Sequence, residues 1–230
     1  MALPHLHLIS FPLCPFVQRS VILLKHKNVP FELTLLNPQE LPDWFLERSP
    51  TGKVPLLLVD QDTAVFESAV ISEYVDDITP PPMLPTAPLE RALERAWIAF
   101  VSDLVMAMHR WMTAPTEEAF RTAGDEAAKG LQRLEAQCKA APCFSGPDLS
   151  LLDAALAPVL MRLDLLQDPD GPWQPDDYPL LASWWRHVSS LPEVKESIVE
   201  DFRERLVRFL NAQEGFAGPR LAAGLAARGH

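Results

Sequence analysis

An α/β domain followed by an all-helical domain is the fold class that the sequence predicts, from three observations. Strand-like and helix-like hydrophobic patterns alternate over residues 1–78, a run with five prolines in ten residues occupies 79–88, and only helical patterns follow over 89–230. Proline lacks the amide proton and fixes φ, so the 79–88 run can continue neither a helix nor a central strand. We therefore expect two domains joined by a stiff linker.

The elements of the first domain follow from the spacing of apolar residues. Four segments have the pattern of strands: residues 5–9, 31–36, 55–59 and 63–66. Three segments have apolar residues at helical spacing: residues 15–27, 40–48 and 68–78. Pro15 suits the start of the first helix, where the missing N–H costs nothing. The order β-α-β-α-β-β-α is that of a thioredoxin-like domain.

The second half is expected to be a helical bundle. Five segments have helical spacing: residues 89–111, 116–138, 151–166, 180–190 and 193–210. In the first of them one apolar stripe is expected to face the core: Leu89, Leu93, Trp97, Phe100, Leu104, Met108 and Trp111. From Gly215 onward the chain is rich in Gly and Ala, and composition alone predicts a loose tail over 215–230.

The composition excludes several classes of protein. The 230 residues carry 20 Lys and Arg against 31 Asp and Glu, and 48% are hydrophobic. That hydrophobic share excludes a disordered chain. No apolar run reaches 18 residues, so no membrane-spanning helix is expected. The first residues also lack the pattern of a secretion signal. Residues 1–78 and 89–230 have net charges of −5 and −6, so neither offers a basic nucleic-acid surface. Three cysteines fit a reducing compartment, and we expect a cytoplasmic protein.

Cys14-Pro15-Phe16 is the most informative tripeptide, because it lies between the first strand and the first helix. A thiol at a helix start meets the positive end of the helix dipole and free N–H groups, which favour the thiolate. Val17 stands where a C-x-x-C motif has its second cysteine. The thiol that resolves a disulfide at Cys14 must therefore come from a small molecule. An inert buried cysteine is the alternative.

Two further motifs stand at element boundaries. A cis Val54–Pro55 bond would turn the backbone N–H and C=O of Val54 toward a molecule docked beside Cys14; an ordinary trans bond is equally compatible with the sequence. Glu67-Ser68 stands at the start of the 68–78 helix, where free N–H groups can bind a carboxylate and Glu67 can accept from an ammonium group. A simple helix N-cap is the alternative that these two residues alone favour.

Other polar residues are interpreted as structural. Ser150 and Asp153 have the spacing of a capping box before the 151–166 helix. Cys138 and Cys143 are expected to be structural or incidental thiols. The histidines of the first strand lack further ligands at useful spacing, so no metal is expected.

In their order and spacing, Cys14-Pro15-Phe16, Ser49–Pro55, Glu67-Ser68 and Ser150-x-x-Asp153 resemble a cytosolic glutathione transferase over about residues 5–210. The cysteine followed by Pro-Phe is similar to the omega class and the dehydroascorbate reductases, rather than to the tyrosine or serine classes. The resemblance implies the glutathione transferase fold and glutathione as cosubstrate, without metal or nucleotide. It also implies a two-fold homodimer.

The resemblance further implies roles for individual residues. Cys14 would form a mixed disulfide with glutathione, Val54 would pair its backbone with the cysteinyl part, and Glu67 and Ser68 would hold the γ-glutamyl group. The implied glutathione-binding residues are Phe16, Lys53, Val54, Pro55, Glu67 and Ser68. The implied walls of the second-substrate pocket are His109, Trp111, Arg162 and Trp184.

We therefore expect glutathione-dependent thiol transfer to a small electrophilic or oxidised thiol-type substrate: disulfide exchange, dehydroascorbate reduction or removal of glutathione from a conjugate. One residue departs from the omega-like pattern, since Leu41 stands where a lysine usually precedes Pro-x-Trp-Phe. This departure favours the alternative, a non-catalytic binding protein of the same fold, similar to the stringent-starvation proteins or the soluble chloride-channel-like proteins. The presence of Cys14, Glu67 and Ser68 argues against it.

Overall fold

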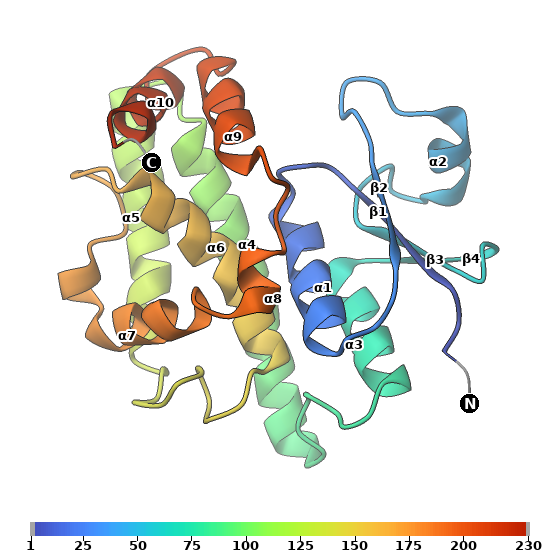
Figure 1. Ribbon diagram of the computed structural model, residues 1–230. Coiled ribbons are helices and arrows are strands. Elements are labelled where there is room, and N and C mark those ends of the chain that lie inside the picture. Colours follow the sequence, from blue (N-terminus) through green and yellow to red (C-terminus); the bar gives the residue numbers. More distant parts are fainter. Residues whose placement is uncertain (1–2, 229–230) are drawn as a thin grey trace.

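A computed structural model describes residues 3–228, and residues 1–2 and 229–230 lie outside it (Figure 1). The first part of the chain forms a four-stranded sheet with three helices, and the rest is helical, so the expected fold class is confirmed. The 79–88 run lies between these parts, in neither helix nor strand until α4 begins at Pro88. No helix of the described chain is long and apolar enough to cross a membrane.

The sheet has the strand order β2-β1-β3-β4, with β1 parallel to β2 and antiparallel to β3, and β4 antiparallel to β3. The strands are β1 (Leu6–Ser10), β2 (Glu32–Leu35), β3 (Leu56–Val59) and β4 (Thr63–Phe66). Three helices accompany them: α1 (Pro15–His26), α2 (Asp43–Arg48) and α3 (Ser68–Ile78).

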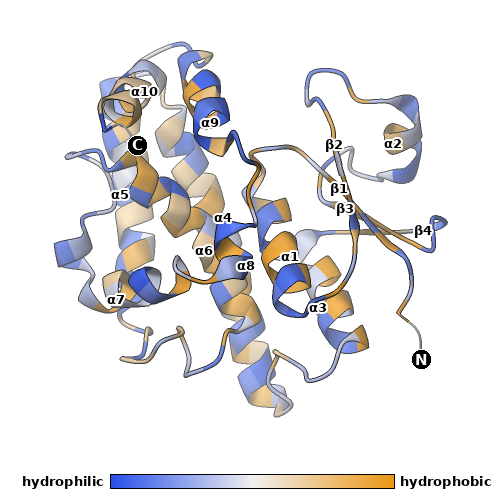
Figure 2. Ribbon diagram, in the orientation of Figure 1, coloured by the Kyte–Doolittle hydropathy of each residue, from blue (hydrophilic) through white to orange (hydrophobic). Residues whose placement is uncertain are grey.

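The two faces of the sheet are buried against different helices. Leu8 on one face joins the large core that includes α1, α3 and the helical part, whereas Ile9 on the other face packs in a small cluster with Phe45 of α2. This division follows from the two-residue period of a strand. Figure 2 shows hydrophobic residues along β1 and β3 and on α1, and also on helices of the helical part.

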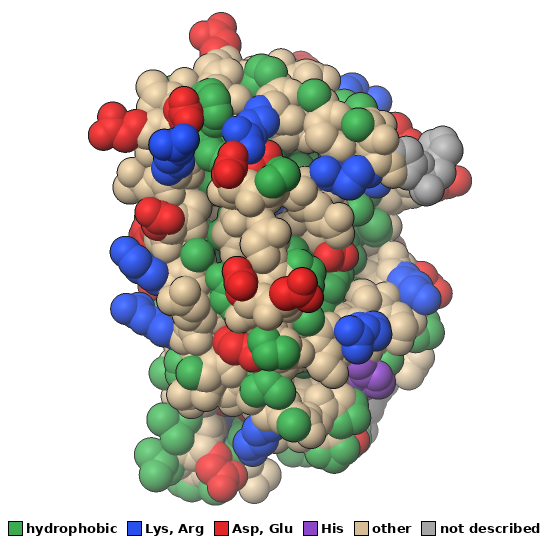
Figure 3. All heavy atoms as spheres, turned by 90° about the vertical axis from the view of Figure 1, so that its left-hand side faces the viewer, with side chains coloured by type: hydrophobic (Ala, Val, Ile, Leu, Met, Phe, Trp, Pro, Cys, Tyr) green, Lys and Arg blue, Asp and Glu red, His purple; other side chains and the backbone are tan. Residues whose placement is uncertain are grey.

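The helical part is built around α6, which packs against both α1 and α4. Its helices are α4 (Pro88–Met112), α5 (Glu117–Glu135), α6 (Leu151–Leu166), α7 (Pro179–Val188), α8 (Pro192–Lys195), α9 (Phe202–Asn211) and α10 (Ala217–Ala227), with a short 3-10 turn at Pro175–Asp177. On the face drawn in Figure 3, acidic and basic side chains are interspersed among uncharged ones.

The structure corrects the expected helix over 193–210, which is two helices with a break between Lys195 and Phe202. Apolar spacing continues across the break because Ile198 and Val199 pack against the core without being helical. The Ser197 hydroxyl in this break accepts a hydrogen bond from the Gln18 side chain of α1, at 2.9 Å. In Figure 1 the connection from α8 to α9 passes beside the start of α1.

The expected loose tail is also wrong over its described part, because it contains α10. Leu221 and Leu225 are buried against the rest of the helical part. Gly218 permits the close packing on α9, since a Cβ there would lie 2.3 Å from the Leu210 carbonyl oxygen. Composition indicates flexibility but does not reveal such packing.

The expected core stripe of α4 is buried only in its second half. Leu104, Met108 and Trp111 are buried, whereas Leu89 is 73% exposed and Leu93 is also exposed. The first turns of α4 extend beyond the helices that cover the rest of it, so the same spacing leaves an apolar surface there (Figure 1).

Candidate functional site

The strand register brings three of the predicted site segments together at one end of the sheet, where β1 and β4 end and β3 begins. Ile9 of β1 pairs with Leu56 of β3, and Leu56 pairs with Phe66 of β4. The turn with Cys14 follows β1, Val54 comes just before β3, and Glu67 follows β4. The three segments therefore converge because of the antiparallel pairing.

Cys14 is the N-cap residue of α1 and is partly buried. Burial raises the pKa of the Cys14 thiol above its usual value. Hydrogen bonds from the backbone N–H groups of Val17 and Phe16, and the charges of Arg162 and Arg19, lower this pKa but do not outweigh burial. The helix start thus acts in the expected direction, but burial outweighs it and the pKa of Cys14 lies above its usual value.

Two buried arginines lie close enough to Cys14 for their charges to act on it. Arg162 of α6 is 2% exposed and Arg19 of α1 is 5% exposed. Burial lowers the pKa of each guanidinium to about 10, and a negative charge on Cys14 opposes that shift. None of the ion pairs among residues 3–228 includes either arginine. Neither guanidinium therefore has a carboxylate oxygen within 4.0 Å in the described chain, although the charge of Glu67 still acts on Arg19.

Neutral groups hold the two arginines in place. Arg162 donates from Nη1 to Gln18 Oε1 at 2.7 Å and from Nη2 to the Leu13 carbonyl at 2.9 Å. Leu13 immediately precedes Cys14, so α6 fixes the turn that carries the thiol. Arg19 donates to Ser102 Oγ of α4 at 3.3 Å and lies over the Phe16 ring, 5.0 Å from its centroid.

The Val54–Pro55 peptide bond is cis, which decides between the two alternatives that the sequence left open. Within residues 3–228 neither the N–H nor the C=O of Val54 has a hydrogen-bond partner. The neighbouring Lys53 carbonyl accepts from Ser49 Oγ at 3.2 Å, while its side chain is exposed. Val54 therefore offers a free donor and a free acceptor at this end of the sheet.

Glu67 has a φ of 68°, a left-handed conformation that is uncommon for a residue other than glycine. Such strain costs about 1–3 kcal/mol and is concentrated at functional sites. Neither Glu67 nor Ser68 caps α3 with its side chain, so the simple N-cap interpretation is wrong. Ser68 is instead the first residue of the helix and is buried. Arg19 is close enough to Glu67 for the two charges to interact, which places the start of α3 beside the start of α1.

A cavity of about 310 Å³ lies beside Cys14, between the β1–α1 turn, strand β2 and the break before α9. Arg162 is one of its walls. Sequence reasoning missed its other walls, which include Phe11, Gln18, Phe31, Leu33, Val199 and Phe202. Gln18 stands one helical turn after Cys14, and this spacing was the one available signal.

The expectation that Trp111 and Trp184 wall this pocket is wrong. They are 1% and 0% exposed, and neither belongs to the lining of the cavity. Trp184 donates from Nε1 to Asp153 Oδ1 at 2.6 Å, and Trp111 packs on Phe120 with ring centroids 5.3 Å apart. His109 is exposed on α4 and lies near Phe209, outside the lining of the cavity.

The capping box of α6 is confirmed. Ser150 Oγ accepts from the Asp153 N–H, and Asp153 Oδ2 accepts from the Ser150 N–H at 2.8 Å. The same buried carboxylate also accepts from the Phe144 N–H at 2.8 Å and from Trp184. Asp153 therefore joins the start of α6 to the preceding loop and to α7, and its role is structural.

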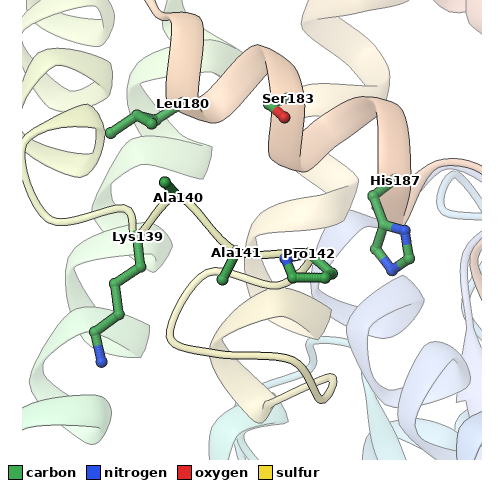
Figure 4. Close-up of a pocket in the computed structure, with 7 residues that line it drawn as sticks. All are labelled: Lys139, Ala140, Ala141, Pro142, Leu180, Ser183 and His187. Atoms are coloured by element: carbon green, nitrogen blue, oxygen red, sulfur yellow. The ribbon is translucent and has the colours of Figure 1, made fainter.

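A second cavity of about 370 Å³ lies between the 139–142 loop and α7 (Figure 4). Its walls are Lys139, Ala140, Ala141, Pro142, Leu180, Ser183 and His187. None of the predicted site residues lines it, and neither Cys138 nor Cys143 does. We therefore take the cavity beside Cys14 as the candidate site.

Comparisons with known proteins agree with the fold and identify the family. Models of the glutathione S-transferase N-terminal and C-terminal domains match residues 13–78 and 92–187. The chain is 28% identical to glutathione S-transferase omega-1 of Sus scrofa, over 83% of this chain and 79% of the relative. It is 32% identical to a probable cytosolic glutathione S-transferase DHAR1 of Oryza sativa subsp. japonica, over 71% and 74%.

A solved structure supports the same relationship. The crystal structure of glutathione transferase Omega 3C from Trametes versicolor matches with a TM-score of 0.76 and 28% identity, covering 86% of this chain and 91% of that one. The two domain models together match well over half of the sequence, in the order in which the α/β and helical parts occur. The chain therefore belongs to the glutathione S-transferase family.

Proposed function

We propose that this protein is a glutathione-dependent thiol transferase in which Cys14 carries the glutathionyl group. The observation that carries the proposal is the position of Cys14: a thiol at the start of α1, within reach of two buried arginine charges and open to a cavity. The similarity to omega-1 and DHAR1 glutathione transferases supports it. The proposed cosubstrate is reduced glutathione, and the proposed location of the protein is the cytoplasm.

Glutathione is proposed to bind across the end of the sheet where Cys14, Val54 and Glu67 lie. The free N–H and C=O of Val54, before cis Pro55, would pair with its cysteinyl residue. The start of α3 at Glu67 and Ser68 would hold the γ-glutamyl group, since a helix N-terminus favours a carboxylate. Phe16 and Lys53 are further proposed contacts. Leu41 is partly buried and offers no charge for the other glutathione carboxylate.

The proposed cycle has two exchange steps. The Cys14 thiolate attacks the glutathionyl sulfur of a mixed disulfide, the old S–S bond breaks, and its electron pair leaves with the second thiolate. A glutathione thiolate then attacks the glutathionyl sulfur bound to Cys14, which releases oxidised glutathione and restores the Cys14 thiolate. The proton lost by the attacking glutathione thiol is taken up through water by the thiolate that leaves in the first step, so each cycle converts one mixed disulfide and one reduced glutathione into one free thiol and one oxidised glutathione.

The assays that test this function compare three reactions. We expect glutathione-dependent reduction of hydroxyethyl disulfide and of dehydroascorbate, and poor conjugation of chlorodinitrobenzene, because a thiolate at position 14 reacts at sulfur instead of activating glutathione by a hydrogen bond. A protein that catalyses none of the three and is not retained on a glutathione column would support the non-catalytic alternative.

The raised pKa of Cys14 predicts the pH dependence of its alkylation. In a Cys138→Ala/Cys143→Ala background, the rate with iodoacetamide should rise with pH through a midpoint above that of an ordinary cysteine, because only the thiolate reacts and burial disfavours it. Arg19→Met should move the midpoint further upward, since the charge of Arg19 lowers this pKa. A midpoint below the ordinary cysteine value would contradict the account.

We also propose that α3 and α4 face a second copy of the chain in a two-fold dimer. Val70 of α3 and Leu89 and Leu93 of α4 are exposed apolar residues, and exposed apolar surface of this kind is typical of interfaces. Arg95 of α4 pairs with Glu73 of α3 at 2.9 Å, which joins the two helices into one surface.

A further inference from the structure

Arg162 is a buried cation whose identified partners are all neutral. Its hydrogen bonds go to Gln18 Oε1 at 2.7 Å, the Pro158 carbonyl at 2.6 Å and the Leu13 carbonyl at 2.9 Å. Arginine has five N–H donors, so two remain without an acceptor in the part of the chain that the structure describes. A buried charge is costly unless an opposite charge accompanies it. The missing anion points to a ligand.

The rest of the cavity carries no net charge. Lys25 and Glu196 at its rim pair with each other at 3.0 Å. Most of the remaining wall is apolar, formed by Phe11, Phe31, Leu33, Leu35, Val199 and Phe202. The Phe202 ring centroid lies 5.1 Å from the Arg162 guanidinium carbon. A single uncompensated cation therefore stands in an apolar cavity beside Cys14.

Gln18 fixes this cation. Its Nε2 donates to Ser197 Oγ at 2.9 Å and to Met161 Sδ at 3.2 Å, which leaves Oε1 turned to Arg162. The amide thus joins α1, α6 and the break before α9 around one guanidinium. A charge held in this way is ready to bind an anion without rearrangement.

We propose that the cavity beside Cys14 binds the non-glutathione half of the substrate as an apolar group bearing a carboxylate, and that Arg162 binds this carboxylate. The inference rests on the proposed function and specifies its substrate class. In the first exchange step, Cys14 takes the glutathionyl sulfur, and the leaving thiolate is the one attached to the carboxylate-bearing group. The size of the cavity, about 310 Å³, is sufficient for one aromatic ring.

The test uses two mixed disulfides of glutathione, one with 5-thio-2-nitrobenzoate and one with its neutral carboxamide. For each, kcat/KM is divided by the rate constant of the uncatalysed reaction with glutathione, which corrects for the leaving thiol. The wild type should prefer the carboxylate by roughly 10- to 100-fold, the range for a hydrogen bond between charged groups.

Two variants should abolish this preference by different means. Arg162→Met removes the cation, and Gln18→Glu supplies a carboxylate of the same size within hydrogen-bond distance of Nη1, which pairs with the cation and preserves the packing. In both the preference should fall to within about threefold of unity, whereas Arg162→Lys should retain part of it. Lys129→Met, an exposed cation on α5, is the matched control and should leave the preference unchanged.

The ratio separates anion binding from positioning, because a change in Cys14 reactivity affects both disulfides alike. A wild-type ratio near unity, or a preference that survives in Gln18→Glu, would overturn the inference. Failure of the wild type to turn over either disulfide would refute the proposed function instead. Calorimetry with 2-nitrobenzoate and 2-nitrobenzamide on the wild type and Gln18→Glu then decides the inference alone: a carboxylate preference lost in the variant supports it, and equal affinities refute it.

Discussion

Cys14→Ser is expected to lower kcat/KM for glutathione-dependent disulfide reduction on the order of 10³-fold or more. A hydroxyl cannot form the mixed disulfide, so the loss removes the covalent intermediate rather than weakening binding. The substitution is nearly isosteric at a partly buried position, so the unfolding temperature should change little. The measurement is steady-state kinetics with hydroxyethyl disulfide, together with thermal unfolding of each variant.

The other two cysteines supply the matched controls for this experiment. Cys138 and Cys143 are buried, and burial raises the pKa of each to about 12. Cys138→Ala and Cys143→Ala should therefore keep their turnover, once it is expressed per folded molecule. An activity that survives Cys14→Ser but is lost in either control would move the reacting thiol away from α1.

Asp153→Ala is expected to lower the free energy of unfolding by about 3–5 kcal/mol. The buried carboxylate accepts from the Ser150 and Phe144 N–H groups, the Ser150 hydroxyl and Trp184 Nε1. Alanine would leave these donors buried without partners, at about 1–3 kcal/mol each before the structure relaxes.

Urea and thermal unfolding would measure this loss, which corresponds to a drop in Tm of about 6–20 °C for a chain of this size. Asp148→Ala provides the control, because Asp148 is an exposed carboxylate in the loop just before the same helix. Its substitution should change stability by no more than about 0.5 kcal/mol. Equal effects of the two substitutions would contradict the structural role assigned to Asp153.

The regular elements could be predicted largely from the sequence. The helices over 68–78 and 151–166 and the strand over 63–66 have the bounds that hydrophobic spacing predicts. Spacing failed where tertiary contacts decide the conformation. In the break before α9 the Ser197 hydroxyl bonds Gln18 of α1, and α10 packs on α9 at Gly218, and neither contact can be read from spacing.

The candidate site was predictable only where local chemistry marks it. Cys14, Val54 and Glu67 stand at element boundaries, and the strand order brings those boundaries together. The walls of the cavity are ordinary apolar residues from distant segments. Periodicity also cannot distinguish a tryptophan that lines a pocket from one in the core. The resemblance implies Trp111 and Trp184 as pocket walls, but both are buried in the core. The direction of the Cys14 pKa depends on burial, which local sequence does not contain.

The most direct test of the central claim is the intact mass of the protein after incubation with oxidised glutathione. The wild type should gain one glutathionyl group, which reduced glutathione removes, and Cys14→Ala should gain none although Cys138 and Cys143 are still present. This result would establish Cys14 as the residue that carries glutathione. The absence of an adduct on the wild type, or an adduct that persists in Cys14→Ala, would contradict the account.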